Sequence, residues 1–84
     1  MAQLDINTIK QLEKGRNLVH EKVATTYTVF SDDGKKYVQI DTYGKSNRTL
    51  PEKISQSIQF DRDTARFLIK LFVKEYGFSI DVSE

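Results

Sequence analysis

The chain has 84 residues, no cysteine and a formal net charge of +1 at pH 7. We treat residues 1–84 as a single domain, because a chain of this length allows no more than one. A chain this short buries only about 60% of the surface that its unfolded form exposes, so its stability margin is thin. Without cysteine, neither a disulfide nor a cysteine-based metal site can support so small a core, which leaves close packing and oligomerisation. The absence of cysteine also fits a reducing compartment, so we expect a cytoplasmic protein.

The N-terminal segment, residues 1–20, mixes charged with apolar positions. It lacks the uninterrupted apolar stretch of a signal peptide. No run in the chain approaches the roughly 20 apolar residues that a membrane span needs. Residues 4–14 predict a short helix with Asp5 or Asn7 as its N-cap.

Three segments have the residue types of β-strands. Residues 23–30 are dense in β-branched and aromatic side chains, and residues 37–43 follow a turn that ends in Gly34. Residues 54–60 alternate apolar with polar side chains over most of their length. Together they predict a short antiparallel β-sheet within 23–60, a meander of three or more strands.

Residues 62–76 predict one amphipathic C-terminal helix, with Asp61 as N-cap and Gly77 just beyond its last turn. At about 100° per residue its apolar side chains form a compact stripe, which we expect to pack on one face of the sheet. We call these side chains the helix stripe: Ala65, Leu68, Ile69, Phe72 and Tyr76. The predicted fold class is therefore α+β.

The apolar arc of this helix is wider than one sheet face can cover. Phe67 and Leu71 extend it, and leaving either side chain in water forgoes roughly 1.5 to 3 kcal/mol of burial. A second copy of the chain is the simplest surface to cover them, so we predict a homodimer with Phe67 and Leu71 in its interface. In the alternative, Ile6, Ile9 or Leu12 of the N-terminal segment packs over them.

The sheet face opposite the apolar one is polar and carries aromatic rings. Strand alternation places Tyr37, Gln39 and Tyr43 on it. Unstacked bases can lie on such rings while amides bond base edges, although ordinary solvent-exposed sheet faces have the same composition. Basic residues flank these strands at a turn and in a long polar loop: Lys35, Lys36, Lys45, Arg48 and Lys53. We predict that they contact the phosphates of single-stranded DNA or RNA.

Motifs for catalysis and metal binding are lacking in the sequence. His20 is the only histidine, so neither a histidine–cysteine metal site nor a Cys-His pair can form. The four glycines stand at turn or cap positions, not in a phosphate-binding loop. We therefore expect no enzyme activity, no cofactor and no metal site.

The run from Tyr37 to Leu71 resembles the single-stranded-DNA-binding domain of the transcriptional positive-cofactor-four family. Residues 37–44 resemble its strand that ends in aromatic residues, residues 51–53 its proline-lysine element, and residues 56–60 its following strand. The chain departs from the family in having no tryptophan near the start of the helix and Ser55 where a glycine often opens the third strand. The same stretch is also similar to short, uncharacterised bacterial proteins. The family resemblance implies a homodimer whose helices pack together and whose sheets bind single strands without strong sequence preference.

Two functions are consistent with these features. The first is a homodimeric, non-catalytic module that binds single-stranded nucleic acid. The second is a protein-interaction module, such as an accessory or inhibitor protein of a bacterial or phage system. It would bind a protein partner through a sheet edge or through the helix patch of Phe67 and Leu71.

Overall fold

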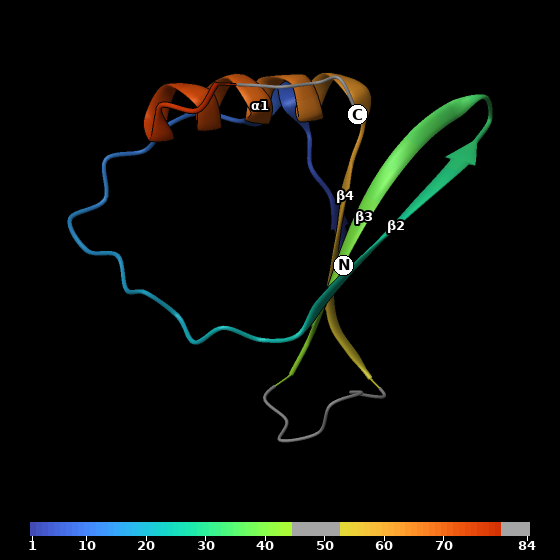
Figure 1. Ribbon diagram of the computed structural model, residues 1–84, viewed down its shortest axis with the longest axis horizontal. Coiled ribbons are helices and arrows are strands. Elements are labelled where there is room, and N and C mark those ends of the chain that lie inside the picture. The colour runs from blue at the N-terminus through green and yellow to red at the C-terminus, as the bar shows by residue number, and fades with distance from the viewer. Residues whose placement is uncertain (45–52, 80–84) are drawn as a thin grey trace.

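The computed structural model describes residues 1–44 and 53–79, and these form a β-sheet followed by one C-terminal helix (Figure 1). Strands β2 (Thr25–Asp32), β3 (Lys35–Tyr43) and β4 (Ile54–Phe60) are antiparallel neighbours. The predicted α+β fold class is confirmed, with the third strand at its predicted bounds.

A further strand at the N-terminus was not expected. The two residues of β1 (Ala2–Gln3) pair in parallel with Ile58 and Gln59 of β4, and the amide of Leu4 donates to the carbonyl of Gln59 at 3.0 Å. The sheet therefore has four strands in the order β1-β4-β3-β2. A strand this short has no sequence signature, because its pairing comes from residues more than fifty positions away.

β2 begins and ends two residues later than the predicted strand over 23–30, and β3 begins two residues earlier than the predicted strand over 37–43. Asp33 and Gly34 form a two-residue turn with φ values of 53° and 77°, so Asp32 pairs directly with Lys35. Positive φ at both turn positions matches the right-handed twist of the flanking strands, and glycine takes this conformation without steric cost. The tight turn lets the ladder continue to its end.

Helix α1 (Arg62–Tyr76) has the predicted bounds, and a side chain or backbone cap closes each end. The Asp61 carboxylate accepts a hydrogen bond of 2.9 Å from the amide of Thr64. At the other end Gly77 adopts φ 71°, and its amide donates to the carbonyl of Val73 at 2.8 Å. These local interactions explain why the helix could be delimited from the sequence.

The predicted helix over 4–14 shrinks to the 3-10 helix η1 (Ile6–Thr8). Asp5 caps it, accepting from the amide of Asn7 at 2.9 Å. Beyond η1, residues 10–24 form an extended segment, which we call the arm, and every residue of the arm is exposed. A short helix in water is marginal without a packed face, and the residues of the arm are exposed.

The position of α1 differs from the expected packing of the helix on its own sheet. Among the described elements α1 contacts η1 most extensively, with Thr64 fully buried. Figure 1 shows α1 leaving the end of β4 and projecting to one side of the sheet. The helix stripe consequently stays accessible: Ile69 is 50% exposed and Phe72 is 44% exposed.

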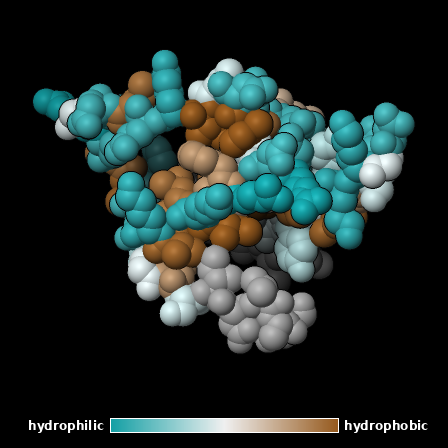
Figure 2. All heavy atoms as spheres, turned by 90° about the horizontal axis from the view of Figure 1, so that it is seen from above, coloured by the Kyte–Doolittle hydropathy of each residue, from teal (hydrophilic) through white to brown (hydrophobic). Residues whose placement is uncertain are grey.

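The described residues contain no fully buried apolar side chain. The chain exposes 8115 Å², whereas a compact monomer of 9.7 kDa exposes about 5,100 Å². Its radius of gyration is 15.2 Å, against about 12 Å for a compact domain of this length. Figure 2 shows hydrophobic residues reaching the surface between hydrophilic ones. A single copy therefore does not complete a hydrophobic core.

The cap at Asp61 predicts a specific acid sensitivity. The hydrogen bond from the Thr64 amide lowers the pKa of Asp61 below its usual value. Its charged form therefore contributes stability that is present above the unfolded-state pKa, roughly pH 4, and lost as the pH falls through the folded-state pKa. Asp61→Asn keeps a capping oxygen but removes the titration, so its unfolding midpoint should change less than that of the wild type below roughly pH 4.

Circular dichroism during urea titrations at fixed protein concentration measures this difference. Asp61→Ala is the control, because it removes the cap and should lower helix content at every pH. If the unfolding midpoints of the wild type and Asp61→Asn fall equally below roughly pH 4, the titration of Asp61 does not cause the acid sensitivity.

Candidate nucleic-acid interface

One face of the sheet carries polar and aromatic side chains in register. The pairing aligns Thr28, Gln39 and Gln59 in one row across β2, β3 and β4. Alternate residues of a strand share a face, so the rows on either side of this one belong to the same surface. We call it the polar face, and its members are Thr26, Thr28, Phe30, Tyr37, Gln39, Asp41, Tyr43, Ser57 and Gln59.

A chain of hydrogen bonds fixes the middle of the polar face. Gln59 Nε2 donates to Gln39 Oε1 at 2.8 Å, and Gln39 Nε2 donates to Asp41 Oδ1 at 2.9 Å. Ser57 Oγ donates to the same Asp41 oxygen at 2.5 Å. Asp41 is only 5% exposed, so its carboxylate orients both donors from below the surface. The two amides are therefore held in place before any ligand arrives.

Tyrosine rings flank this amide row on either side along β3. Tyr37 stacks on Phe30, with ring centroids 5.5 Å apart and an interplanar angle of 24°. The Tyr43 hydroxyl hydrogen-bonds with Thr26 Oγ1 at 2.9 Å. Tyr43 lies six residue steps along β3 from Tyr37, or about 20 Å. Both rings are oriented by a neighbouring side chain and both remain partly accessible.

The basic residues predicted to contact phosphates do not all gather on the polar face. Lys35 shares the face of Tyr37, whereas strand alternation puts Lys36 on the opposite face, and its phosphate contact stays a prediction. Lys53 is exposed directly before β4, at the other end of the sheet from the hairpin turn. Lys45 and Arg48 lie outside the described residues.

Phe30 is the member of the polar face that sequence reasoning missed. The two-residue turn at Asp33 and Gly34 pairs Phe30 with Tyr37, so counting back from that turn would have found it. The ring contact enlarges the aromatic surface at the hairpin end of the sheet. It also fixes the Tyr37 ring against rotation.

The two residues predicted for a dimer interface lie on α1. Phe67 is half-buried and Leu71 is 36% exposed. The contact of α1 with η1 agrees in part with the alternative in which the N-terminal segment covers the helix. Leu12 of that segment is itself exposed, so the part of the N-terminal segment that contacts α1 does not extend beyond η1 and its neighbours.

Other kinds of site have little support in the described part of the chain. Residues 1–44 and 53–79 contain no group of three side chains placed to hold a metal ion. Over the same residues, no helix has both the length and the apolar character that crossing a bilayer requires. An open pocket of ≈ 700 Å³ separates the hairpin tip from the start of α1. The residues that line it are both basic and acidic, so the pocket favours neither an anionic nor a cationic ligand. They include Lys35, Lys36, Arg62, Asp61 and Asp63.

Comparison of the chain with protein-family models, curated proteins and solved structures finds no match. The resemblance to the positive-cofactor-four family therefore stays a prediction from the residues.

The buried network predicts a large effect of Asp41 on stability. Asp41→Ala leaves the Ser57 hydroxyl and the Gln39 amide without their acceptor, which costs about 1 to 3 kcal/mol for a buried unsatisfied group. Ser57→Ala removes one donor and leaves the other bond intact, so it should cost about 0.5 to 1.5 kcal/mol. Urea unfolding at fixed protein concentration measures both. Equal stability of Asp41→Ala and the wild type would mean that the network is not formed in solution.

Proposed function

We propose that this chain is a non-catalytic module that binds single-stranded DNA or RNA on the polar face and works as a homodimer. The observation that carries the proposal is the arrangement of that face. Two oriented tyrosine rings flank a row of ordered amides, and Lys35 and Lys53 stand toward its opposite ends. Aromatic platforms with basic rims are the common design of single-strand binders.

Stacking supplies most of the affinity in this proposal. Bases rest on the rings of Tyr37 and Tyr43, and each stacked base is worth about 1 to 3 kcal/mol. Lys35 and Lys53 neutralise phosphates toward the two ends of the bound strand. The side chains of Lys45 and Arg48 are proposed to add phosphate contacts from the loop before β4.

The amide network favours binding with little sequence preference. Gln39 uses both Oε1 and Nε2 for bonds to Gln59 and Asp41, which leaves it less capacity to read base edges. Stacking tolerates every base because each has a π-face. We therefore propose a general single-strand binder in the cytoplasm, a location that the absence of cysteine supports.

The homodimer is supported by the unfinished core. A folded chain with no buried apolar side chain among its described residues needs another surface to exclude water from its hydrophobic groups. The polar face lies on the other side of the sheet from the exposed Tyr27 and Val29 side chains, so association through that side leaves it open. Two copies then present two such faces to one nucleic-acid strand, which raises affinity through effective concentration.

A protein-interaction module is the second candidate function. The observation that favours it is the position of β2, which forms one edge of the sheet in the order β1-β4-β3-β2 and is exposed along its whole length. An open edge strand can pair with an extended segment of a partner. In this function the partner would be a protein of a bacterial or phage system.

Oligonucleotide titrations followed by fluorescence anisotropy test single-strand binding. If about four phosphates are neutralised per protomer, log affinity should fall with log salt at a slope of about −3. Lys53→Ala, Lys45→Ala or Arg48→Ala should each make the slope shallower by somewhat under one unit, at about 0.7 per phosphate. Lys70→Ala on the outer side of α1 is the matched control and should leave the slope unchanged.

A pair of tyrosine variants separates stacking from electrostatic attraction. Tyr43→Ala should cost about 1 to 3 kcal/mol of affinity and leave the salt slope unchanged, because stacking releases no counterions. Tyr43→Phe keeps the ring and loses only the bond to Thr26, so its affinity should stay close to that of the wild type. No binding at low salt and high micromolar protein would refute single-strand binding and favour the protein-interaction module.

Sedimentation tests the homodimer directly. Each chain has a mass of 9.7 kDa, and at micromolar concentration we expect it to sediment as a dimer. Leu71→Ala and Phe67→Ala should weaken association or stability, since each removes apolar surface worth roughly 1.5 to 3 kcal/mol. A folded monomer at high concentration would contradict the homodimer whatever the outcome of the oligonucleotide titrations.

A further inference from the structure

The sheet has an apolar face that nothing within the described residues covers completely. In one row Tyr27 pairs with Ile40 and Ile40 with Ile58, so these three side chains share a face. Tyr27 is 72% exposed, and none of the described apolar side chains is fully buried. We call this surface the apolar face, and its members are Tyr27, Val29, Val38, Ile40, Ile58 and Phe60.

Helix α1 is not free to fold down over this face. Only Asp61 stands between the end of β4 at Phe60 and the start of α1 at Arg62. Its backbone is fixed at φ −87° and ψ −179° by the cap to Thr64. Thr64 is itself fully buried where α1 meets η1. Turning the helix onto its own sheet would break the contact with η1.

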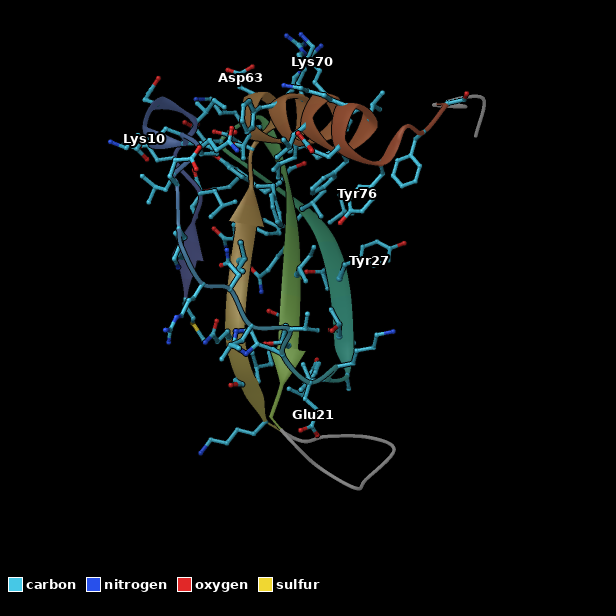
Figure 3. The ribbon with its side chains drawn as sticks, turned by 90° about the vertical axis from the view of Figure 1, so that its left-hand side faces the viewer. Lys10, Glu21, Tyr27, Asp63, Lys70 and Tyr76 are labelled. Carbon is cyan, nitrogen blue, oxygen red and sulfur yellow. The ribbon has the colours of Figure 1, made fainter. Side chains whose placement is uncertain are left out.

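The helix stripe nevertheless lies on the same side of the sheet as the apolar face. Figure 1 shows α1 and the arm projecting to one side of the strands. In Figure 3, which views the sheet from that side, Tyr76 points from the helix toward the strands, while Lys70 points away from them. Tyr76 is 72% exposed and makes ring contacts with Phe72 at 6.4 Å and Phe78 at 5.5 Å. An aromatic cluster thus faces the side where the apolar face is uncovered.

We propose that two copies of the chain exchange their helices, so that the helix stripe of each α1 packs on the apolar face of its partner. The occupant is a second copy because one chain offers both halves of the contact. A two-fold axis lets both stripes and both sheet faces be covered at once, and the assembly closes as a dimer.

The exposed surface area of one chain is consistent with a second copy as the partner. Each copy exposes about 3,000 Å² more than a compact monomer of its mass. Obligate homodimers bury about 2,000 to 5,000 Å² in total, and their interfaces resemble a domain core divided in two. For two copies the surplus is about 6,000 Å² in total, which is enough area for the interface of a stable exchanged dimer.

The arm extends the same contact. It runs on the side of the sheet to which α1 projects (Figure 1), and its apolar Leu18 and Val19 are exposed. When the partner's helix lies on the apolar face, the arm passes beside that helix and its apolar residues gain a surface to contact. Folding and association are then one process, because neither copy has a hydrophobic core without the other.

Cysteine cross-linking tests the exchange, since the natural chain has no cysteine. Chains carrying Tyr27→Cys and chains carrying Phe72→Cys, one of them with a mass tag, are mixed in urea, refolded and treated with a short bifunctional maleimide. The exchanged dimer should give a covalent product of one tagged and one untagged chain. Val29→Cys with Tyr76→Cys is a second pair, also at exposed positions, in case the first pair folds poorly.

Two matched variants serve as controls. Thr28→Cys is the neighbour of Tyr27 on the polar face, and Lys70→Cys lies on the outer side of α1. Replacing either partner of a cross-linking pair by its control should abolish the mixed product. Circular dichroism confirms that each variant is folded.

The outcomes separate this inference from the proposed function on which it rests. If Phe72→Cys links only to itself in a dimer, the helices pair with each other and the exchange is wrong. A monomer in sedimentation overturns both the exchange and the homodimer. If the mixed product forms but oligonucleotides do not bind, the exchange stands and single-strand binding is refuted.

Discussion

Asp61 joins the last strand to the helix without a loop, and the position of α1 depends on it. The carboxylate caps the helix through the Thr64 amide, and the extended backbone at Asp61 aims α1 away from its own sheet. Because α1 does not cover the apolar face, Tyr27 and Val29 of that face stay exposed. The open hydrophobic surface, the large radius of gyration and the proposed dimer all follow from this one junction.

The two faces of the sheet differ in chemical character. Strand alternation sends Tyr27, Ile40 and Ile58 to one side and Thr28, Gln39 and Gln59 to the other. In the proposed function, the apolar face serves association and the polar face binds the ligand. The proposed dimer would then leave both polar faces uncovered.

The polar face is rigid in its middle because a buried carboxylate organises it. Asp41 accepts bonds from Gln39 and Ser57, and burying a charge is costly unless such donors compensate it. An ordinary solvent-exposed face does not need a buried acid. The network instead orients amides and leaves the tyrosines accessible at either side, as a preorganised stacking platform requires.

Local chemistry determined what the sequence by itself could predict. The caps at Asp61 and Gly77 set the bounds of α1, and the period of two placed Tyr37 and Gln39 on one face. Tyr43 follows a register irregularity, and its hydrogen bond to Thr26 places it on that face. Contacts between distant segments decided the rest, namely the parallel pairing of β1 with β4, the stacking of Phe30 on Tyr37 and the direction of α1. Pattern shows which side chains are apolar, but not which surface covers them, because burial depends on residues far away in the chain or in another copy.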